Sequence, residues 1–151
     1  ALACLGDATA AERAILSAIR YRRNDVVLHS DDSLLPRARR ARAAWNFHVP
    51  EGLNDSATVS YDMARLQGLY APIPLLVTLN RTEAIDPARI LKRFTYHHPV
   101  YDRAALEAQA EREVISGANR SHYCGAYWGY GFHEDGGRSA HAVAAELARE
   151  G

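Results

Sequence analysis

The sequence predicts an α+β fold, in which an antiparallel sheet of about five strands has flanking helices and is followed by a last helix at the C-terminus. Short alternating or β-branched segments, separated by turn residues, recur up to about residue 100 and are typical of such strands. Beyond residue 100 the apolar residues recur at helical spacing instead. A chain of 151 residues can form one ordinary domain, so we expect these elements to share one compact unit.

A short helix is expected at residues 9–20. Thr9 is followed three residues later by Glu12, which is the spacing of a capping box, where each side chain binds the other residue's backbone amide. Isoleucine and leucine then recur on one side of this segment. Both observations favour a helix that packs through a single apolar face.

Five strands are expected next, because each apolar run is bounded by Pro, Asn, Asp or Ser. The segment PEGLNDS at residues 50–56 has turn chemistry throughout, so the strands on either side of it should form a hairpin. The start of the fifth run could also be helical. The strands are placed at about residues 26–28, 43–49, 58–61, 73–80 and 88–99.

The pattern then changes to helix, strand, loop and helix. Residues 101–116 have helical periodicity, and SHYCGAY at residues 121–127 is expected to form a short strand. The last helix, rich in small residues, is expected to begin near residues 134–137. We therefore divide the chain into a sheet with its N-terminal helix at residues 1–100 and the returning elements at residues 101–151.

Composition narrows the class of protein. Eighteen basic residues balance 18 acidic ones, which argues against a surface for nucleic acid. No apolar run approaches the roughly 20 residues of a membrane span, and no signal-peptide pattern occurs. Because Cys4 and Cys124 are too few for a disulfide scaffold, a cytoplasmic location is expected. The chain begins ALACLGD, without Met, from which we expect a piece of a longer protein.

The segment GAYWGYGFHEDGG at residues 125–137 combines glycines, aromatic residues and an acidic pair before the last helix. A helix N-terminus offers unpaired N–H groups and a partial positive charge to an anion or an electron-rich ring edge. Glycines allow the backbone to approach a ligand, and aromatic side chains can flank a flat ring. The arrangement favours a large, flat, anionic ligand. The alternative is a long loop whose aromatic residues fill the core and whose Glu134 and Asp135 cap the helix.

The order NRSHYCGAYWGYGFHEDGGRSAHAVAAEL resembles the C-terminal flavin-contacting segment of the FAD-dependent amine oxidase superfamily, in particular its bacterial branch of predicted NAD/FAD-binding proteins. Further stretches that carry the resemblance are YRRNDVVLHSDDSLLP, AAWNFHV, VSYDMARLQGL, VTLNRTEAIDP and FTYHHPVYDRAALEAQ. The resemblance implies a substrate-domain sheet together with the C-terminal strand and helix of a split FAD-binding domain. The half that carries the glycine-rich dinucleotide-binding loop would precede this chain.

The resemblance implies FAD as cofactor, and hydride transfer to the flavin from a small-molecule organic substrate. It names no acid–base residue, and without the dinucleotide-binding half the chain is expected to be inactive and to bind FAD weakly. Ala126 stands where the wider superfamily has an acidic residue, and Gly137 and Ala140 also depart from its pattern. The residues implied for the flavin are Gly125, Ala126, Tyr127, Trp128, Glu134, Asp135, Gly136 and Gly137. Those implied for the substrate region are Trp45, Asn46, Tyr61 and Met63.

Other chemistry is less well supported. The histidines lack metal-ligand spacing, since His133 and His141 are eight residues apart, so no metal site is expected. Cys124, at the end of an expected buried strand, is interpreted as a small hydrophobe. The cluster RARRAR at residues 37–42 could bind a phosphate or an acidic partner, but it is interpreted as the charged edge of a strand. Asp31 and Asp32 are close in sequence and could pair with these arginines. A non-enzymatic alternative remains, in which the domain docks a separate nucleotide-binding chain.

Overall fold

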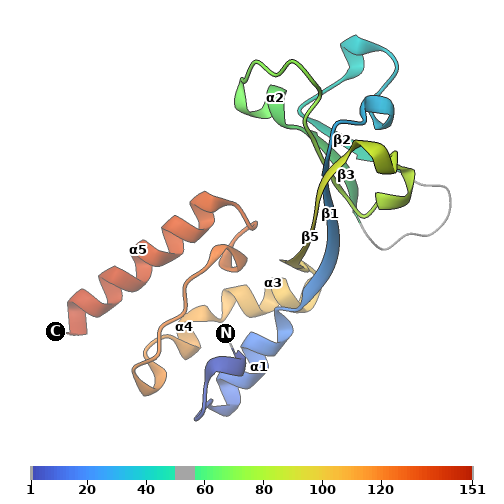
Figure 1. Ribbon diagram of the computed structural model, residues 1–151. Helices are drawn as coiled ribbons and strands as arrows, with labels where there is room; N and C mark the ends of the chain where they lie inside the picture. The colour runs from blue at the N-terminus through green and yellow to red at the C-terminus, as the bar shows by residue number, and fades with distance from the viewer. Residues whose placement is uncertain (1, 50–56, 151) are drawn as a thin grey trace. The chain divides into compact units, whose positions relative to one another are not determined.

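The computed structural model describes residues 2–49 and 57–150 (Figure 1). It divides into two compact units. The helical unit consists of Ala1–Arg22 and His98–Gly151, and the sheet unit consists of Arg23–His97. The fold is α+β, as the sequence predicts. The turn chemistry expected at residues 50–56 lies outside the described residues.

All five expected strands form one antiparallel sheet with the strand order β2-β3-β4-β1-β5. The expected hairpin is confirmed, because β2 and β3 pair with Trp45 opposite Tyr61 and His48 opposite Thr58. In the central pair, Val26 of β1 lies opposite Leu79 of β4. The strands are β1 (Tyr21–His29), β2 (Trp45–His48), β3 (Thr58–Asp62), β4 (Leu76–Leu79) and β5 (Ile90–Pro99).

Short helical turns connect the strands of the sheet unit. The helix α2 (Met63–Gln67) is capped by the Asp62 side chain, which accepts from the Arg65 amide at 3.2 Å, and it ends at Gly68 with φ of 65°. The helical alternative for the start of the last strand region is confirmed over three residues. The 3-10 turns of this unit are η2 (Asp32–Leu34), η3 (Arg39–Ala41), η4 (Thr82–Ala84) and η5 (Pro87–Arg89).

One face of the sheet is unusual because most of the residues that are buried on it are polar. An antiparallel sheet commonly buries its apolar face and exposes its polar one. Here the buried residues of one face, which we call the polar face, are mostly hydrogen-bonding ones: His29, Asn46, Thr58, Ser60 and Thr78, with Val27 and Leu76. The other, the aromatic face, carries Val26, Leu28, Trp45, Phe47, Val59, Tyr61, Val77 and Leu79. On it Trp45 is 55% and Phe47 66% exposed, whereas Val26 and Val59 are buried.

The first α-helix of the helical unit is the expected capped helix α1 (Ala10–Ala18). The capping box is confirmed, since Thr9 N donates to Glu12 Oε2 at 2.6 Å and Glu12 N donates to Thr9 Oγ1 at 3.2 Å. The expected helix at residues 101–116 forms as two pieces that meet at Glu111. The remaining helices are α3 (Arg103–Ala110), α4 (Arg112–Ile115) and α5 (His133–Glu150), with the 3-10 turns η1 (Leu2–Cys4), η6 (Ala118–Arg120) and η7 (Ala126–Trp128).

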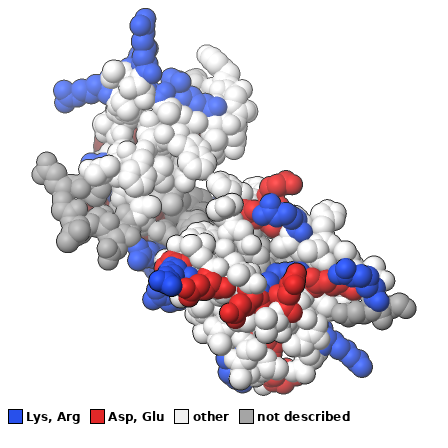
Figure 2. Space-filling view, turned by 180° about the vertical axis from the view of Figure 1, so that it is seen from behind, with Lys and Arg blue, Asp and Glu red and all other residues white. Residues whose placement is uncertain are grey.

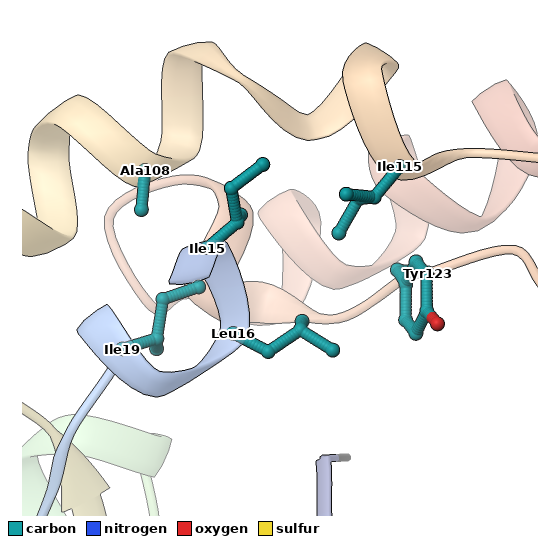
Figure 3. Packing of buried hydrophobic residues seen from close by; sticks show 6 residues of the cluster. All are labelled: Ile15, Leu16, Ile19, Ala108, Ile115 and Tyr123. Atoms are coloured by element: carbon teal, nitrogen blue, oxygen red, sulfur yellow. The ribbon is translucent and has the colours of Figure 1, made fainter. Parts of the chain in front are cut away.

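The core of the helical unit lies where α1 packs against α3, α4 and the segment that follows them (Figure 3). Full burial of an aliphatic side chain such as Ile115, which is 0% exposed, contributes about 1.5–3 kcal/mol. Tyr123 also reaches this core, and its hydroxyl donates to Glu12. Burial, followed by the bond to Glu12, raises the pKa of Tyr123 to about 12. The cluster consists of Ile15, Leu16, Ile19, Ala108, Ile115 and Tyr123.

The short strand expected at residues 121–127 is wrong. The segment from Ser121 to Cys124 has no regular secondary structure, and η7 begins just after it, with Gly125 in between. A strand needs a neighbouring strand for its backbone hydrogen bonds, and the sheet of the described residues does not include this segment. The expected burial of Cys124 is wrong for the same reason, because this side chain is exposed.

The surface charge and the hydropathy of the helices are consistent with the amino-acid composition. On the face shown in Figure 2, acidic and basic side chains lie next to one another in one band of the surface. In the part of the chain that the structure describes, no helix has the length and apolar character that a bilayer crossing requires.

Candidate functional site

Three glycines of the segment at residues 125–137 are required by the loop itself. An ideal Cβ on Gly129 would lie 2.5 Å from the Asp135 carboxyl carbon, and one on Gly131 would lie 2.5 Å from the Tyr101 hydroxyl oxygen. Gly131 also has φ of +90°, which side chains rarely allow. At Gly125 a Cβ would collide with the Tyr127 ring. These glycines let the loop pack closely against its own side chains and against Tyr101.

The Asp135 carboxylate holds the loop that precedes α5. Its Oδ2 accepts from the amides of Tyr130 at 2.9 Å and Phe132 at 3.1 Å, and its Oδ1 accepts from Arg138. These bonds, the one from Phe132 first, lower the pKa of Asp135. The residue is only 6% exposed. The sequence offered the alternative that Asp135 caps the last helix. Its side chain does act as such a cap, although the amides that it binds belong to residues before the helix.

Two polar side chains outside the implied flavin set anchor the same loop. Ser139, four residues after Asp135 on α5, accepts from the Gly125 amide at 2.8 Å. Gln109 of α3 donates from Nε2 to the carbonyls of Tyr127 and Gly129, each at 2.8 Å. Sequence reasoning missed both. The one signal for Ser139 is its helical spacing from Asp135.

Gly136 and Gly137 differ from the loop glycines because packing does not require them. They lie inside α5 and not before it, so the expectation that glycines precede the helix is corrected here. The nearest atom to an ideal Cβ on Gly136 is Ala126 N at 3.7 Å, an ordinary contact, and nothing lies within 4 Å of one on Gly137. Glycine in a helix is about 1 kcal/mol less favourable than alanine. The fold alone therefore does not explain this pair.

The N-terminus of α5 offers backbone donors beside these glycines. The first hydrogen bond inside the helix runs from Gly136 N to Phe132 O at 3.2 Å. The amides of the preceding residues in the first turn, from His133 to Asp135, have no carbonyl one turn back within the helix. They carry the positive end of the helix dipole. Glu134, in the same turn, is exposed. The turn can thus bind a carboxylate, a phosphate or a ring edge through its main chain.

The aromatic residues of the segment divide into two pairs. Tyr127 and Trp128 are half-buried, with ring centroids 5.1 Å apart, and they pack against the core of the helical unit. Tyr130 and Phe132 are 80% and 58% exposed. A cavity of about 240 Å³ adjoins Tyr127, lined also by Leu2, Ala3, Leu16, Ser17, Ile19 and Tyr21.

The residues implied for the substrate region are separated by the two faces of the sheet. Trp45 and Tyr61 lie opposite each other on the aromatic face, with ring centroids 5.3 Å apart and planes at 79°. Burial raises the pKa of Tyr61. Asn46 lies on the polar face, 7% exposed, and its Nδ2 donates to Ala43 O at 2.8 Å. Met63 begins α2, and its amide donates to Leu75 O at 2.9 Å.

The histidines and the arginine cluster are the other candidates from the sequence. Within residues 2–49 and 57–150, no group of three His, Cys, Asp or Glu side chains could hold a metal ion. The arginines at 37–42 lie on a 3-10 turn and its flanks, so their interpretation as a strand edge is wrong. Arg42 pairs with Asp32 at 3.0 Å, as the sequence suggests.

Neither the protein-family models nor the curated proteins include a match to this chain.

Proposed function

We propose that this chain is the C-terminal part of an FAD-dependent oxidoreductase of the amine-oxidase type. The resemblance of the segment at residues 125–137 suggests this function, and the geometry at the start of α5 supports it best. The sheet unit would be the substrate domain. The helical unit would supply the last elements of the FAD-binding domain, whose dinucleotide-binding half lies outside the chain.

The supporting observation is the pair Gly136 and Gly137. The helix has room for a Cβ at each position, and alanine would favour the helix by about 1 kcal/mol per residue. A residue type that the fold does not need is explained if a ligand must approach the backbone there. The residues present fit a flavin, because its pyrimidine edge is polar and electron-rich, which suits the first-turn amides of α5.

The flavin, when bound, supplies the redox chemistry by accepting a hydride from the substrate. The role of this chain would be to position the flavin ring and to stabilise the negative charge that develops on it. The amides from His133 to Asp135 would stabilise negative charge at the ring edge. Gly136 would keep the helix close to the ring. Asp135 acts indirectly, since its carboxylate shapes the loop through Tyr130 and Phe132.

The substrate would meet the aromatic face of the sheet. Trp45 and Tyr61 form an edge-to-face pair there, and Trp45 is 55% exposed. Such rings provide an apolar wall with a polar hydroxyl at one end. Asn46 supports this wall from the polar face, where it joins Ala43 and Ser60.

Two open surfaces support a missing dinucleotide-binding half. One is the aromatic face, since exposed aromatic side chains in a contiguous patch are typical of an interface. The other is on α5, whose buried positions Asp135 and Ser139 are polar. One stripe of exposed positions on α5, at helical spacing, is small or apolar and consists of Gly137, Ala140, Ala144 and Leu147.

The test compares the chain with its longer form. The genomic DNA upstream of Ala1 is read for an in-frame G-x-G-x-x-G, and the longer protein is then expressed. We expect yellow, flavin-containing protein from the longer form, and no sub-micromolar FAD binding by the 151-residue chain in an absorbance titration. A longer protein with the glycine motif but without flavin would contradict the proposal.

The second candidate function is a non-enzymatic docking domain for a separately encoded nucleotide-binding chain. The exposed aromatic face supports this docking function as much as it supports the oxidoreductase. Size-exclusion chromatography with the upstream gene product distinguishes the two. A stable complex of two chains would support docking, whereas one continuous reading frame would support the oxidoreductase.

A further inference from the structure

A continuous chain of hydrogen bonds crosses four strands on the polar face of the sheet. It begins at the Asp31 amide, which donates to His29 Nδ1 at 3.2 Å. His29 Nε2 on β1 lies 2.8 Å from Thr78 Oγ1 on β4. Thr78 Oγ1 lies 2.6 Å from Ser60 Oγ on β3, and Ser60 Oγ lies 2.9 Å from His48 Nε2 on β2.

The middle of this chain is closed to water. His29 and Ser60 are 0% exposed, and Thr78 is 1% exposed. A buried hydroxyl hydrogen without an acceptor costs about 1–3 kcal/mol. A single hydrogen must therefore lie between each pair of neighbouring nitrogen or oxygen atoms in this chain of hydrogen bonds. Two hydrogens cannot point at each other across the same contact.

The Asp31 amide determines the direction of every bond. A backbone N–H can only donate, so His29 Nδ1 accepts and the neutral ring carries its hydrogen on Nε2. That hydrogen fills the contact with Thr78, so the Thr78 hydroxyl donates to Ser60. The Ser60 hydroxyl in turn donates to His48 Nε2. Burial, the largest cause, lowers the pKa of His29, which agrees with a neutral ring.

We infer that the Asp31 amide fixes the tautomer of His48 through this chain, so that neutral His48 carries its hydrogen on Nδ1 and the β2–β3 edge is coupled to the turn after β1. The opposite direction would place a hydrogen on His29 Nδ1, facing the Asp31 N–H. Reversal thus requires that turn to move.

The turn is held in place by the Asp31 carboxylate. It accepts from the Ser33 amide at 3.0 Å and from the Asp86 amide at 2.9 Å. The coupled edge carries Trp45 and Tyr61 on its opposite face. This inference does not depend on a flavin.

The tautomers can be observed directly in the 151-residue chain. Long-range ¹H–¹⁵N correlation spectra at about pH 8, above the ordinary histidine pKa of about 6.5, report which ring nitrogen carries hydrogen. Signals are assigned with His29→Gln and His48→Gln. We expect the hydrogen on Nε2 of His29 and on Nδ1 of His48. A native His48 with its hydrogen on Nε2 would overturn the inference.

The coupling is tested with Thr78→Val, which keeps the shape of the side chain and removes the hydroxyl. We expect His48 to relax to a mixture of tautomers while His29 keeps its hydrogen on Nε2. Thr95→Val, at an exposed threonine of β5, is the matched control and should leave both rings unchanged. A His48 tautomer that is unaltered in Thr78→Val would also overturn the inference. If Thr78→Val does not fold, Ser60→Ala provides the same comparison, and the native spectrum remains decisive.

Discussion

The Ser139 hydroxyl bridges both backbone groups of Gly125: the glycine amide lies 2.8 Å and the carbonyl 3.1 Å from Ser139 Oγ. This contact fixes the first residue of the glycine–aromatic segment to the first half of α5. Ser139 is not among the residues that the resemblance implies for the flavin, but its contacts with Gly125 help to determine their geometry.

Replacing Ser139 should loosen this loop. Ser139→Ala leaves the Gly125 amide without its acceptor in a site where the serine is 8% exposed, so we expect a loss of about 1–2 kcal/mol in the free energy of unfolding. Urea denaturation measures it. Ser17→Ala, at an exposed serine, should change the free energy by no more than about 0.5 kcal/mol. Equal losses of unfolding free energy in the two variants would show that the contact between Ser139 and Gly125 does not stabilise the fold.

The core of the helical unit gives a second prediction with a neighbouring control. Ile115→Ala removes a side chain that is 0% exposed, and we expect it to cost about 2–5 kcal/mol. Val114→Ala, where the side chain is 66% exposed, should cost less than about 0.5 kcal/mol. The midpoints of chemical denaturation measure both. A comparable loss at Val114 would mean that α4 does not pack as described.

Stability should fall as the pH decreases through the range where histidine titrates. Because burial lowers the pKa of His29 below its ordinary value of 6.5, the folded state favours the neutral ring. Asp31, the acidic residue beside it, opposes this effect only in part. The contribution of the neutral His29 ring to stability is thus fully present above about pH 6.5 and is lost as the pH falls below it. The free energy of unfolding at several pH values should show this slope, His29→Gln should reduce it, and the exposed His97→Gln should retain it.

The glycines of the segment should respond in opposite directions to alanine. Gly136→Ala should increase stability by up to about 1 kcal/mol, because the Cβ has room and alanine favours the helix. Gly131→Ala should decrease stability by more than about 1 kcal/mol, because φ is +90° and the Cβ would meet Tyr101. Thermal unfolding of both variants measures the difference. A destabilised Gly136→Ala would mean that the fold itself requires that glycine.

Local patterns predicted most of the fold. The Thr9–Glu12 spacing predicted α1, and the alternation with turn residues predicted five strands and the β2–β3 hairpin. These signals depend on residues close together in sequence. The strand expected at residues 121–127 was wrong because strand formation also needs a partner, and no local pattern shows whether one is present.

The site could be predicted only in outline. The glycine and aromatic residues marked the segment, but the sequence does not distinguish Gly131, which the loop requires, from Gly136, for which packing gives no reason. The anchoring by Gln109 joins residues about twenty positions apart, and the chain from His29 to His48 joins four strands. Such contacts depend on tertiary packing, which residue spacing does not reveal.

The flavin content of Gly136→Ala in the longer protein tests the flavin site most directly. Flavin is measured by absorbance per mole of purified protein, with Gly6→Ala as a control glycine that also has open space around it. We predict that Gly136→Ala unfolds at the same or a higher temperature and loses at least about tenfold in flavin affinity, about 1.4 kcal/mol, while Gly6→Ala keeps its flavin. Full flavin content in Gly136→Ala would contradict a flavin at the start of α5.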